Sequence, residues 1–200
     1  DIGKRMLSYE ESLKILKDTK ALQEGHFILS SGLHSRQYIQ CAKLLSFPEK
    51  AEIICQSLCS KIKNKFGNIN LILSPALGGV VVGYEIGRQL KVETIFSERV
   101  GGKLILRRGF EIKPSSNVLI VEDVITTGKS ALECADLIKE YKANLTGYAC
   151  IIDRSTKDIT FKNNIVSQME FLIETFSKDK IPTDLKSIDP TKPGSRNLSK

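Results

Sequence analysis

The fold of this chain is decided by the stretch Val118-Leu119-Ile120-Val121-Glu122-Asp123-Val124-Ile125-Thr126-Thr127-Gly128-Lys129-Ser130. It begins as an apolar run typical of a buried strand, passes two adjacent acids, and ends in hydroxyl residues around a glycine. An amphipathic pattern follows over residues 129–141 and predicts a helix. Strand, short loop and helix in this order are typical of parallel sheets, which bind ligands at the carboxyl ends of their strands.

Residues 126–130 suit a phosphate group. The first N–H groups of a helix are free, and the helix dipole favours an anion there. Gly128 would let the backbone approach closely, and the hydroxyls of Thr126, Thr127 and Ser130 add donors. A simple helix N-cap is the alternative, but it accounts for a single hydroxyl residue and not for this cluster.

Two acids, Glu122 and Asp123, stand before this loop. Carboxylates beside an anion site are unfavourable unless they contact something, and ribose hydroxyls or Mg²⁺ shared with a pyrophosphate would satisfy them. Solvated charges at a strand end are the alternative. A triphosphatase loop is excluded, because it requires a glycine five residues before Gly128 and this chain has Asp123 there.

Strands and helices alternate along most of the chain, which predicts an α/β fold with a parallel sheet covered on both faces. A second glycine-bearing loop, Pro75-Ala76-Leu77-Gly78-Gly79, would lie at the same sheet edge as residues 126–130. We expect the tail from 178 to 200 to be draped over the domain or partly disordered. The expected elements are helices at 8–20, 48–65, 80–90 and 129–141, strands at 70–73, 94–97, 118–121 and 145–152, and hairpins at 25–40 and 104–112.

Composition sets broad limits on the class of protein. Two hundred residues predict one domain. The net charge of +7 fits nucleic acid, an anionic small substrate or merely solvated lysines, and does not choose among them. No apolar run approaches the roughly 20 residues of a membrane span, and residues 1–16 lack the apolar core of a signal peptide. With five scattered cysteines that fit reduced thiols, these features predict a cytoplasmic protein without a membrane partner.

The acids and the Thr-Gly loop together resemble the signature of type I phosphoribosyltransferases, whose loop holds the 5-phosphate of phosphoribosyl pyrophosphate (PRPP). Within that family the chain resembles the shorter-loop branch of the orotate phosphoribosyltransferases. The resemblance covers most of the chain. It is carried further by Phe27-Ile28-Leu29-Ser30-Ser31-Gly32-Leu33-His34-Ser35, Glu98-Arg99, Leu106-Arg107-Arg108-Gly109-Phe110, Ile151-Ile152-Asp153-Arg154 and Lys192-Pro193-Gly194-Ser195-Arg196.

The resemblance implies an enzyme that transfers the phosphoribosyl group of PRPP to orotate, giving orotidine 5′-phosphate and diphosphate for pyrimidine biosynthesis. It implies the phosphoribosyltransferase fold, with residues 1–45 and the C-terminal tail forming a small hood and residues 46–155 forming the α/β core of a single domain. It also implies Mg²⁺, held mainly through the substrate and near Asp123, and a homodimer that binds no nucleic acid.

The same resemblance assigns binding residues. Thr126 and Arg154 would contact orotate, because the guanidinium of Arg154 can bind the orotate carboxylate with two hydrogen bonds. Taken alone, Arg154 would more commonly form a surface ion pair with Asp153 or Asp158. The PRPP-binding residues would be Glu122, Asp123, Val124, Ile125, Thr126, Thr127, Gly128, Lys129 and Ser130.

Catalysis would involve the two acids and two basic residues, Arg99 and Lys103. Many family members carry lysine where this chain has Ser30 and Gly78, and their long basic loop is replaced here by residues 99–103. Arg99 and Lys103 would therefore neutralise the departing pyrophosphate. In this family the basic loop reaches across a dimer interface.

Two other functions stay open from the sequence. A purine phosphoribosyltransferase would share the PRPP loop, but Arg154 and residues 27–35 argue against it. A nucleic-acid-binding regulator that keeps the fold would use the positive net charge.

Overall fold

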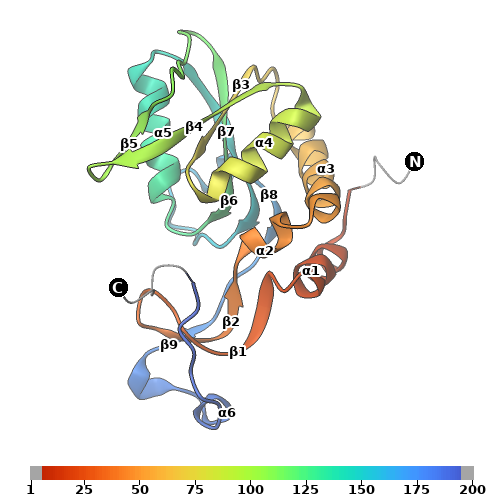
Figure 1. Ribbon diagram of the computed structural model, residues 1–200, viewed down its shortest axis with the longest axis vertical. Helices are drawn as coiled ribbons and strands as arrows, with labels where there is room; N and C mark the ends of the chain where they lie inside the picture. The colour runs from red at the N-terminus through yellow and green to blue at the C-terminus, as the bar shows by residue number, and fades with distance from the viewer. Residues whose placement is uncertain (1–5, 195–200) are drawn as a thin grey trace.

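Two β-sheets of different size organise the chain, and the computed structural model describes them within residues 6–194 (Figure 1). The larger sheet contains β3 (Leu71–Pro75), β4 (Glu93–Val100), β5 (Lys103–Leu106), β6 (Asn117–Ile125), β7 (Asn144–Asp153) and β8 (Ile165–Glu170). Its strand order is β5-β4-β3-β6-β7-β8, and every neighbouring pair is parallel except β4 with β5. The predicted α/β fold with a mostly parallel sheet is confirmed.

Three long helices cover the larger sheet: α3 (Pro48–Lys65), α4 (Gly78–Leu90) and α5 (Lys129–Glu140). Helices α3 and α4 pack on one face and α5 on the other, so the buried residues form two apolar clusters. Helix α4 lies very close to the sheet, because a methyl group at Gly83 would stand only 2.2 Å from Oγ of Ser74. This close packing fixes the position of the loop that precedes α4.

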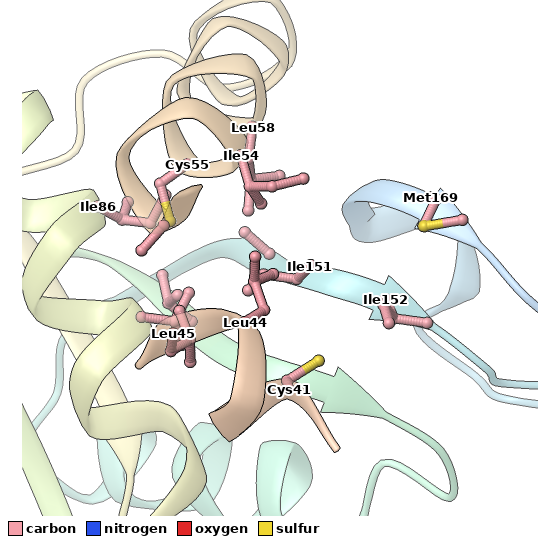
Figure 2. Close-up of a cluster of buried hydrophobic side chains, with 14 of the residues drawn as sticks. Cys41, Leu44, Leu45, Ile54, Cys55, Leu58, Ile86, Ile151, Ile152 and Met169 are labelled. Atoms are coloured by element: carbon pink, nitrogen blue, oxygen red, sulfur yellow. The ribbon is translucent and has the colours of Figure 1, made fainter. Parts of the chain in front are cut away.

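The larger apolar cluster joins the small helix α2 (Cys41–Leu45) to the sheet (Figure 2). Leu44 is fully buried there between α3 and α4 on one side and β7 on the other. Burying a leucine side chain stabilises a fold by roughly 1.5–3 kcal/mol. The chain leaving the hood is therefore tied firmly to the core. The side chains labelled in the view are Cys41, Leu44, Leu45, Ile54, Cys55, Leu58, Ile86, Ile151, Ile152 and Met169.

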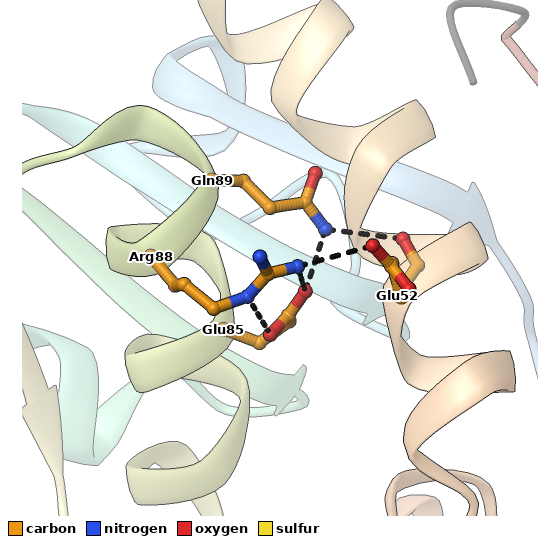
Figure 3. A network of polar contacts seen from close by, with 4 residues as sticks. All are labelled: Glu52, Glu85, Arg88 and Gln89. Atoms are coloured by element: carbon orange, nitrogen blue, oxygen red, sulfur yellow. Dashed lines mark hydrogen bonds and ion pairs between the residues drawn. The ribbon is translucent and has the colours of Figure 1, made fainter.

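A polar network links α4 to α3 on the surface (Figure 3). Arg88 donates to both carboxylate oxygens of Glu85 at 2.8 and 2.9 Å, and to Glu52 at 3.2 Å. Gln89 donates to Glu85 and to the Glu52 carbonyl. The arginine lowers the pKa of the Glu85 carboxyl, which keeps that acid ionised.

The smaller sheet, which we call the hood, contains β1 (Leu22–Ile28), β2 (His34–Ile39) and β9 (Thr175–Phe176) in the order β1-β2-β9. It lies below the larger sheet in Figure 1. The predicted hairpin at 25–40 is confirmed, and Gly32 takes a positive φ of 83° in its turn. The remaining helices are α1 (Tyr9–Asp18), α6 (Thr183–Lys186) and the short 3₁₀ turns η2 (Lys162–Asn164) and η3 (Lys178–Lys180).

The described part of the tail is draped over the hood. Ile28 N–H donates to the Thr191 carbonyl at 2.8 Å, and Thr191 N–H donates to the His26 carbonyl at 2.9 Å. Ser195 and Arg196, which contributed to the family resemblance, lie outside the described residues.

The predicted hairpin at 104–112 is wrong. A turn does form at Arg108-Gly109, where Phe110 N–H donates to the Arg107 carbonyl, but no strand follows it. Strand β5 instead forms an antiparallel hairpin with the preceding strand β4, with Val100 opposite Lys103. Gly101 and Gly102 both have positive φ, at 56° and 81°, which is the geometry that two-residue hairpin turns require.

Within residues 6–194 the longest and most apolar helices still fall short of what crossing a membrane requires. All five cysteines are buried with free thiols.

Candidate functional site

The two glycine-bearing loops leave neighbouring strands at the same sheet edge. Strands β3 and β6 are parallel neighbours, with Leu73 opposite Ile120. The chain continues from β3 into α4 on one face and from β6 into α5 on the other. Ligands of open α/β sheets bind at such a reversal of strand order, beyond the carboxyl ends of the strands.

The amino terminus of α5 is built to hold an anion. Gly128 occupies the N-cap position with φ 78°, and no side chain caps the helix. The Thr127 hydroxyl accepts from the backbone N–H of Lys129, the first residue of α5, at 3.4 Å. The absence of a side-chain cap disfavours the simple N-cap alternative, because the next amides of α5, those of Ser130 and Ala131, stay available to a ligand within the described part of the chain.

Gly128 is also required by crowding. A methyl group there would stand 2.6 Å from Cζ of Phe161 and 2.9 Å from Cδ1 of Ile159. The loop is therefore pressed against residues 159–161, and any larger residue at 128 would displace one or the other.

The two acids lie inside β6, which continues to Ile125; the expected strand end at Val121 is wrong. Successive side chains of a strand point to opposite faces. Asp123 accordingly lies against Gly78 at the start of α4. The charge of Glu122 acts on Cys134 of α5. The acid pair thus straddles the sheet edge between the two helices, and each carboxylate can serve a different ligand group.

Burial perturbs both acids. It raises the pKa of Glu122 to about 8, with a further contribution from the charge of Asp123. Burial also raises the pKa of Asp123, although Val124 N–H donates to its Oδ1 at 2.8 Å and opposes the shift. Within residues 6–194 neither acid has an ion-pair partner. Such a pair gains stability from a bound cation or from hydroxyl donors.

The carboxylates of Glu122 and Asp123 are oxygen donors of the kind that Mg²⁺ prefers. No group of three or more histidine, cysteine or acidic side chains comes together to ligate a metal in the described part of the chain. The residues therefore fit a cation that takes most of its ligands from a bound substrate.

Arg154 is set beside the phosphate loop. Its backbone N–H donates to the carbonyl of Ile125 at 2.8 Å, and Ile125 immediately precedes Thr126. The side chain is half-buried, its Nε is fully buried without a hydrogen-bond partner, and burial lowers its pKa. The alternative of an ion pair with Asp153 or Asp158 is not realised: Asp153 pairs with Lys162 at 2.8 Å. A buried guanidinium without a counter-ion is a receptor for an anion.

Helix α2 connects the hood to this site. Burial raises the pKa of the Cys41 thiol, the charge of Asp123 raises it further, and the charge of Arg154 lowers it. Cys41, the first residue of α2, is therefore within electrostatic reach of both Asp123 and Arg154. Sequence reasoning did not identify this residue.

Arg99 and Lys103 lie beside α5 in this chain. Arg99 forms a two-pronged ion pair with Glu133 at 2.9 and 3.0 Å. Lys103 lies 3.7 Å from Glu140, the last residue of α5. Eleven residues separate Glu140 from Lys129, which is about 16 Å along a helix axis. Within one chain Lys103 thus lies at the far end of α5 from residues 126–130, whereas Arg99 is engaged by Glu133, four residues after Lys129.

Known proteins resemble this chain over most of its length. Residues 48–176 match the family model described as the phosphoribosyl transferase domain. The orotate phosphoribosyltransferase of Caldicellulosiruptor saccharolyticus is 43% identical over 192 residues, which are 96% of this chain and all of that protein.

Solved structures share the fold. The crystal structure of orotate phosphoribosyltransferase from Aeropyrum pernix superimposes with a TM-score of 0.70 at 22% identity, over 79% of this chain and 92% of the other. Adenine phosphoribosyltransferase from Thermoanaerobacter pseudethanolicus superimposes with a TM-score of 0.57 at 15% identity, over 68% of this chain and 88% of the other. The fold is thus common to enzymes named for different bases.

Proposed function

The chain belongs to the phosphoribosyltransferase family, and from that premise we propose that it transfers the phosphoribosyl group of PRPP to orotate. The products are orotidine 5′-phosphate and diphosphate, in pyrimidine biosynthesis. The observation that carries the choice of orotate is Arg154, whose half-buried guanidinium has no counter-ion and lies beside the phosphate loop. Orotate has a carboxylate, and purine bases have none.

The donor would be held by residues 122–130. The free amides at the start of α5, with the hydroxyls of Thr126, Thr127 and Ser130, would bind the 5-phosphate. Glu122 and Asp123 would accept from the ribose hydroxyls, each from its own side of the sheet edge. Thr126 would contact the orotate ring, since its neighbour Ile125 is hydrogen-bonded to Arg154.

Mg²⁺ fits this donor site, near Asp123 and mainly through PRPP oxygens. When bound, it would neutralise charge on the pyrophosphate as that group departs.

In the reaction, N1 of orotate bonds to C1′ of the ribose while the bond from C1′ to the pyrophosphate oxygen breaks. The protein has little covalent work to do: it aligns the two substrates, excludes water and stabilises charge. Arg154 would fix the base, and the α5 amides would fix the sugar phosphate. Ionised Glu122 and Asp123 would favour the positive charge that develops on the ribose.

A homodimer would supply the basic residues. The exposed apolar side chains of Val81 and Tyr84 on α4, with Leu77 in the preceding loop, form a surface beside the site that suits a second copy of the chain. Arg99 and Lys103 would then neutralise pyrophosphate in the partner's site, and the place of Lys103 at the far end of α5 from its own chain's residues 126–130 supports this. We propose that the enzyme works in the cytoplasm as a single domain under its hood.

The proposal is tested by following orotate absorbance when PRPP and Mg²⁺ are added. We expect Arg154→Ala to weaken orotate binding and leave PRPP binding nearly unchanged. Lys157→Ala, which removes an exposed positive charge from the same loop, is the control. Turnover of adenine or guanine in place of orotate would establish a purine enzyme, and salt-dependent nucleic-acid binding without turnover would establish a regulator.

A further inference from the structure

Lys162 donates hydrogen bonds to the residues on both sides of Arg154. Its ammonium donates to Oδ2 of Asp153 at 2.8 Å, to the Ser155 carbonyl at 3.1 Å and to the Ser155 hydroxyl at 3.0 Å. A lysine has three donors, and here all three meet residues adjacent to Arg154. Lys162 itself is mostly buried, with 21% of its side chain exposed.

Both carboxylate oxygens of Asp153 accept hydrogen bonds in this arrangement. Its side chain is 2% exposed, and the Ser155 hydroxyl and N–H both donate to its Oδ1. Lys162 supplies the positive charge that a buried carboxylate needs. Asp153, the carboxylate adjacent in sequence to Arg154, is therefore fixed by Ser155 and Lys162, and these three residues together hold the turn from which the Arg154 side chain leaves.

The segment that carries Lys162 is rigidly placed and also contacts the phosphate loop. Phe161 stacks on the buried Tyr148 with ring centroids 4.1 Å apart. The same Phe161 presses on Gly128, where a methyl group would stand 2.6 Å from its ring. Residues 161 and 162 thus touch the loop proposed for the 5-phosphate and the turn that bears Arg154.

We propose that Lys162 is a positioning residue that determines orotate affinity: by bonding Asp153 and Ser155 on either side of Arg154, it holds the turn that orients the Arg154 guanidinium for the substrate carboxylate. The inference rests on the proposed role of Arg154. Without the ammonium, the buried Asp153 would lack a cation, and the turn that carries Arg154 would lose the contacts that fix it.

The test is calorimetric titration of Lys162→Met with orotate and, separately, with PRPP and Mg²⁺. We expect orotate binding to weaken about tenfold or more, and PRPP binding to change less than about twofold. Lys162→Gln, which keeps a donor but no charge, should show the same selective loss and serves if the methionine variant does not fold. Lys157→Met, an exposed lysine of the same loop, should bind both substrates normally.

The decisive variant is Asp153→Asn, which keeps the shape of the side chain and removes the charge that Lys162 meets. It should show the same selective loss of orotate affinity as Lys162→Met, because the same ion pair is broken. The proposal is overturned if Asp153→Asn binds orotate normally, or if Lys162→Met weakens both substrates equally or neither. A normal orotate affinity in Arg154→Ala would instead contradict the proposed role of Arg154.

Discussion

Asp123 lies directly against Gly78: a methyl group on Gly78 would stand 2.9 Å from Oδ1 and 3.0 Å from Oδ2 of the carboxylate. The loop after β3 is therefore in contact with Asp123 of β6. Gly78 stands where many family members carry lysine, and the Asp123 carboxylate fills the space that a side chain at this position would need. The loop at residues 75–79 and the acids proposed for ribose therefore form one surface.

Replacing Gly78 by alanine should weaken PRPP binding, because the added methyl must displace the Asp123 carboxylate. Overpacking of this kind typically costs about 1–3 kcal/mol, which corresponds to a rise in KM for PRPP of roughly fivefold or more. Steady-state kinetics at saturating orotate would measure it. Gly67→Ala, at an exposed glycine with open space around it, is the matched control. An unchanged KM in Gly78→Ala would mean that Asp123 does not serve PRPP.

Glu122 should make the unliganded protein less stable as the pH rises. Its pKa of about 8 in the folded chain lies above the ordinary 4.5, so the folded state holds the proton more tightly than the unfolded state between these values. Stability should therefore fall from about pH 5 to pH 8, by at most about 1.4 kcal/mol per pH unit from this group. Urea unfolding of wild type and Glu122→Gln across that range would measure the difference. A wild-type curve parallel to that of the variant would contradict the raised pKa.

The hood should respond to pH in the opposite direction. His34 and His26 are both buried, with Nδ1 of His34 2.6 Å from Nε2 of His26, and Nδ1 of His26 lies 2.8 Å from the Ile188 carbonyl. Burial, then the charges of His26 and Lys178, lower the pKa of His34 below 6.5. The stability it contributes is present above pH 6.5 and is lost as the pH falls below that value.

Urea unfolding between pH 5 and 8 would isolate this contribution by comparing wild type with His34→Asn. We expect the variant to lose less stability on acidification than wild type. Because the pair holds the tail through Ile188, limited proteolysis of the tail should also accelerate in acid in wild type. Equal acid sensitivity of both proteins would exclude His34 as the cause.

Gly128 should tolerate alanine less well than Gly109, although both have similar positive φ, at 78° and 73°. The backbone penalty of roughly 1–2 kcal/mol is common to the two positions. Only Gly128 is crowded, by Phe161 and Ile159, whereas Gly109 has open space. Gly128→Ala should therefore lose more stability on denaturant unfolding and also weaken PRPP binding, whereas Gly109→Ala should keep normal affinity. Equal losses would show that crowding at the loop is unimportant.

Periodicity and turn chemistry predicted much of the larger sheet. Helix α3 was predicted with the observed bounds, because Pro48 marks its start and apolar residues recur at helical spacing over 48–65. Strand β6 was predicted to end four residues too early, because two acids look like a strand end. The strand continues since β7 supplies a parallel partner as far as Ile125, which pairs with Asp153.

Features that depend on contacts elsewhere in the fold could not be predicted from the sequence. Arg108-Gly109 and Gly101-Gly102 are both turn signals, and only the pairing of Val100 with Lys103 decides which one joins two strands. Strand β8 was missed because its place at the sheet edge depends on β7. Lys162 carried no signal, because its role depends on bonding two residues nine and seven positions away across an irregular loop.

The hood is assembled from two segments far apart in the chain, so its parts are synthesised at different times. The hairpin ending at Ile39 pairs with β9 at residues 175–176 and obtains its last described partner only when the ribosome has reached Thr191, 152 residues later. At about 5–20 residues per second, that interval is roughly 8–30 s. Throughout it the sheet that bears the PRPP loop can fold while the cover over it is unfinished, so the nascent enzyme would acquire its donor site before it can exclude water from it.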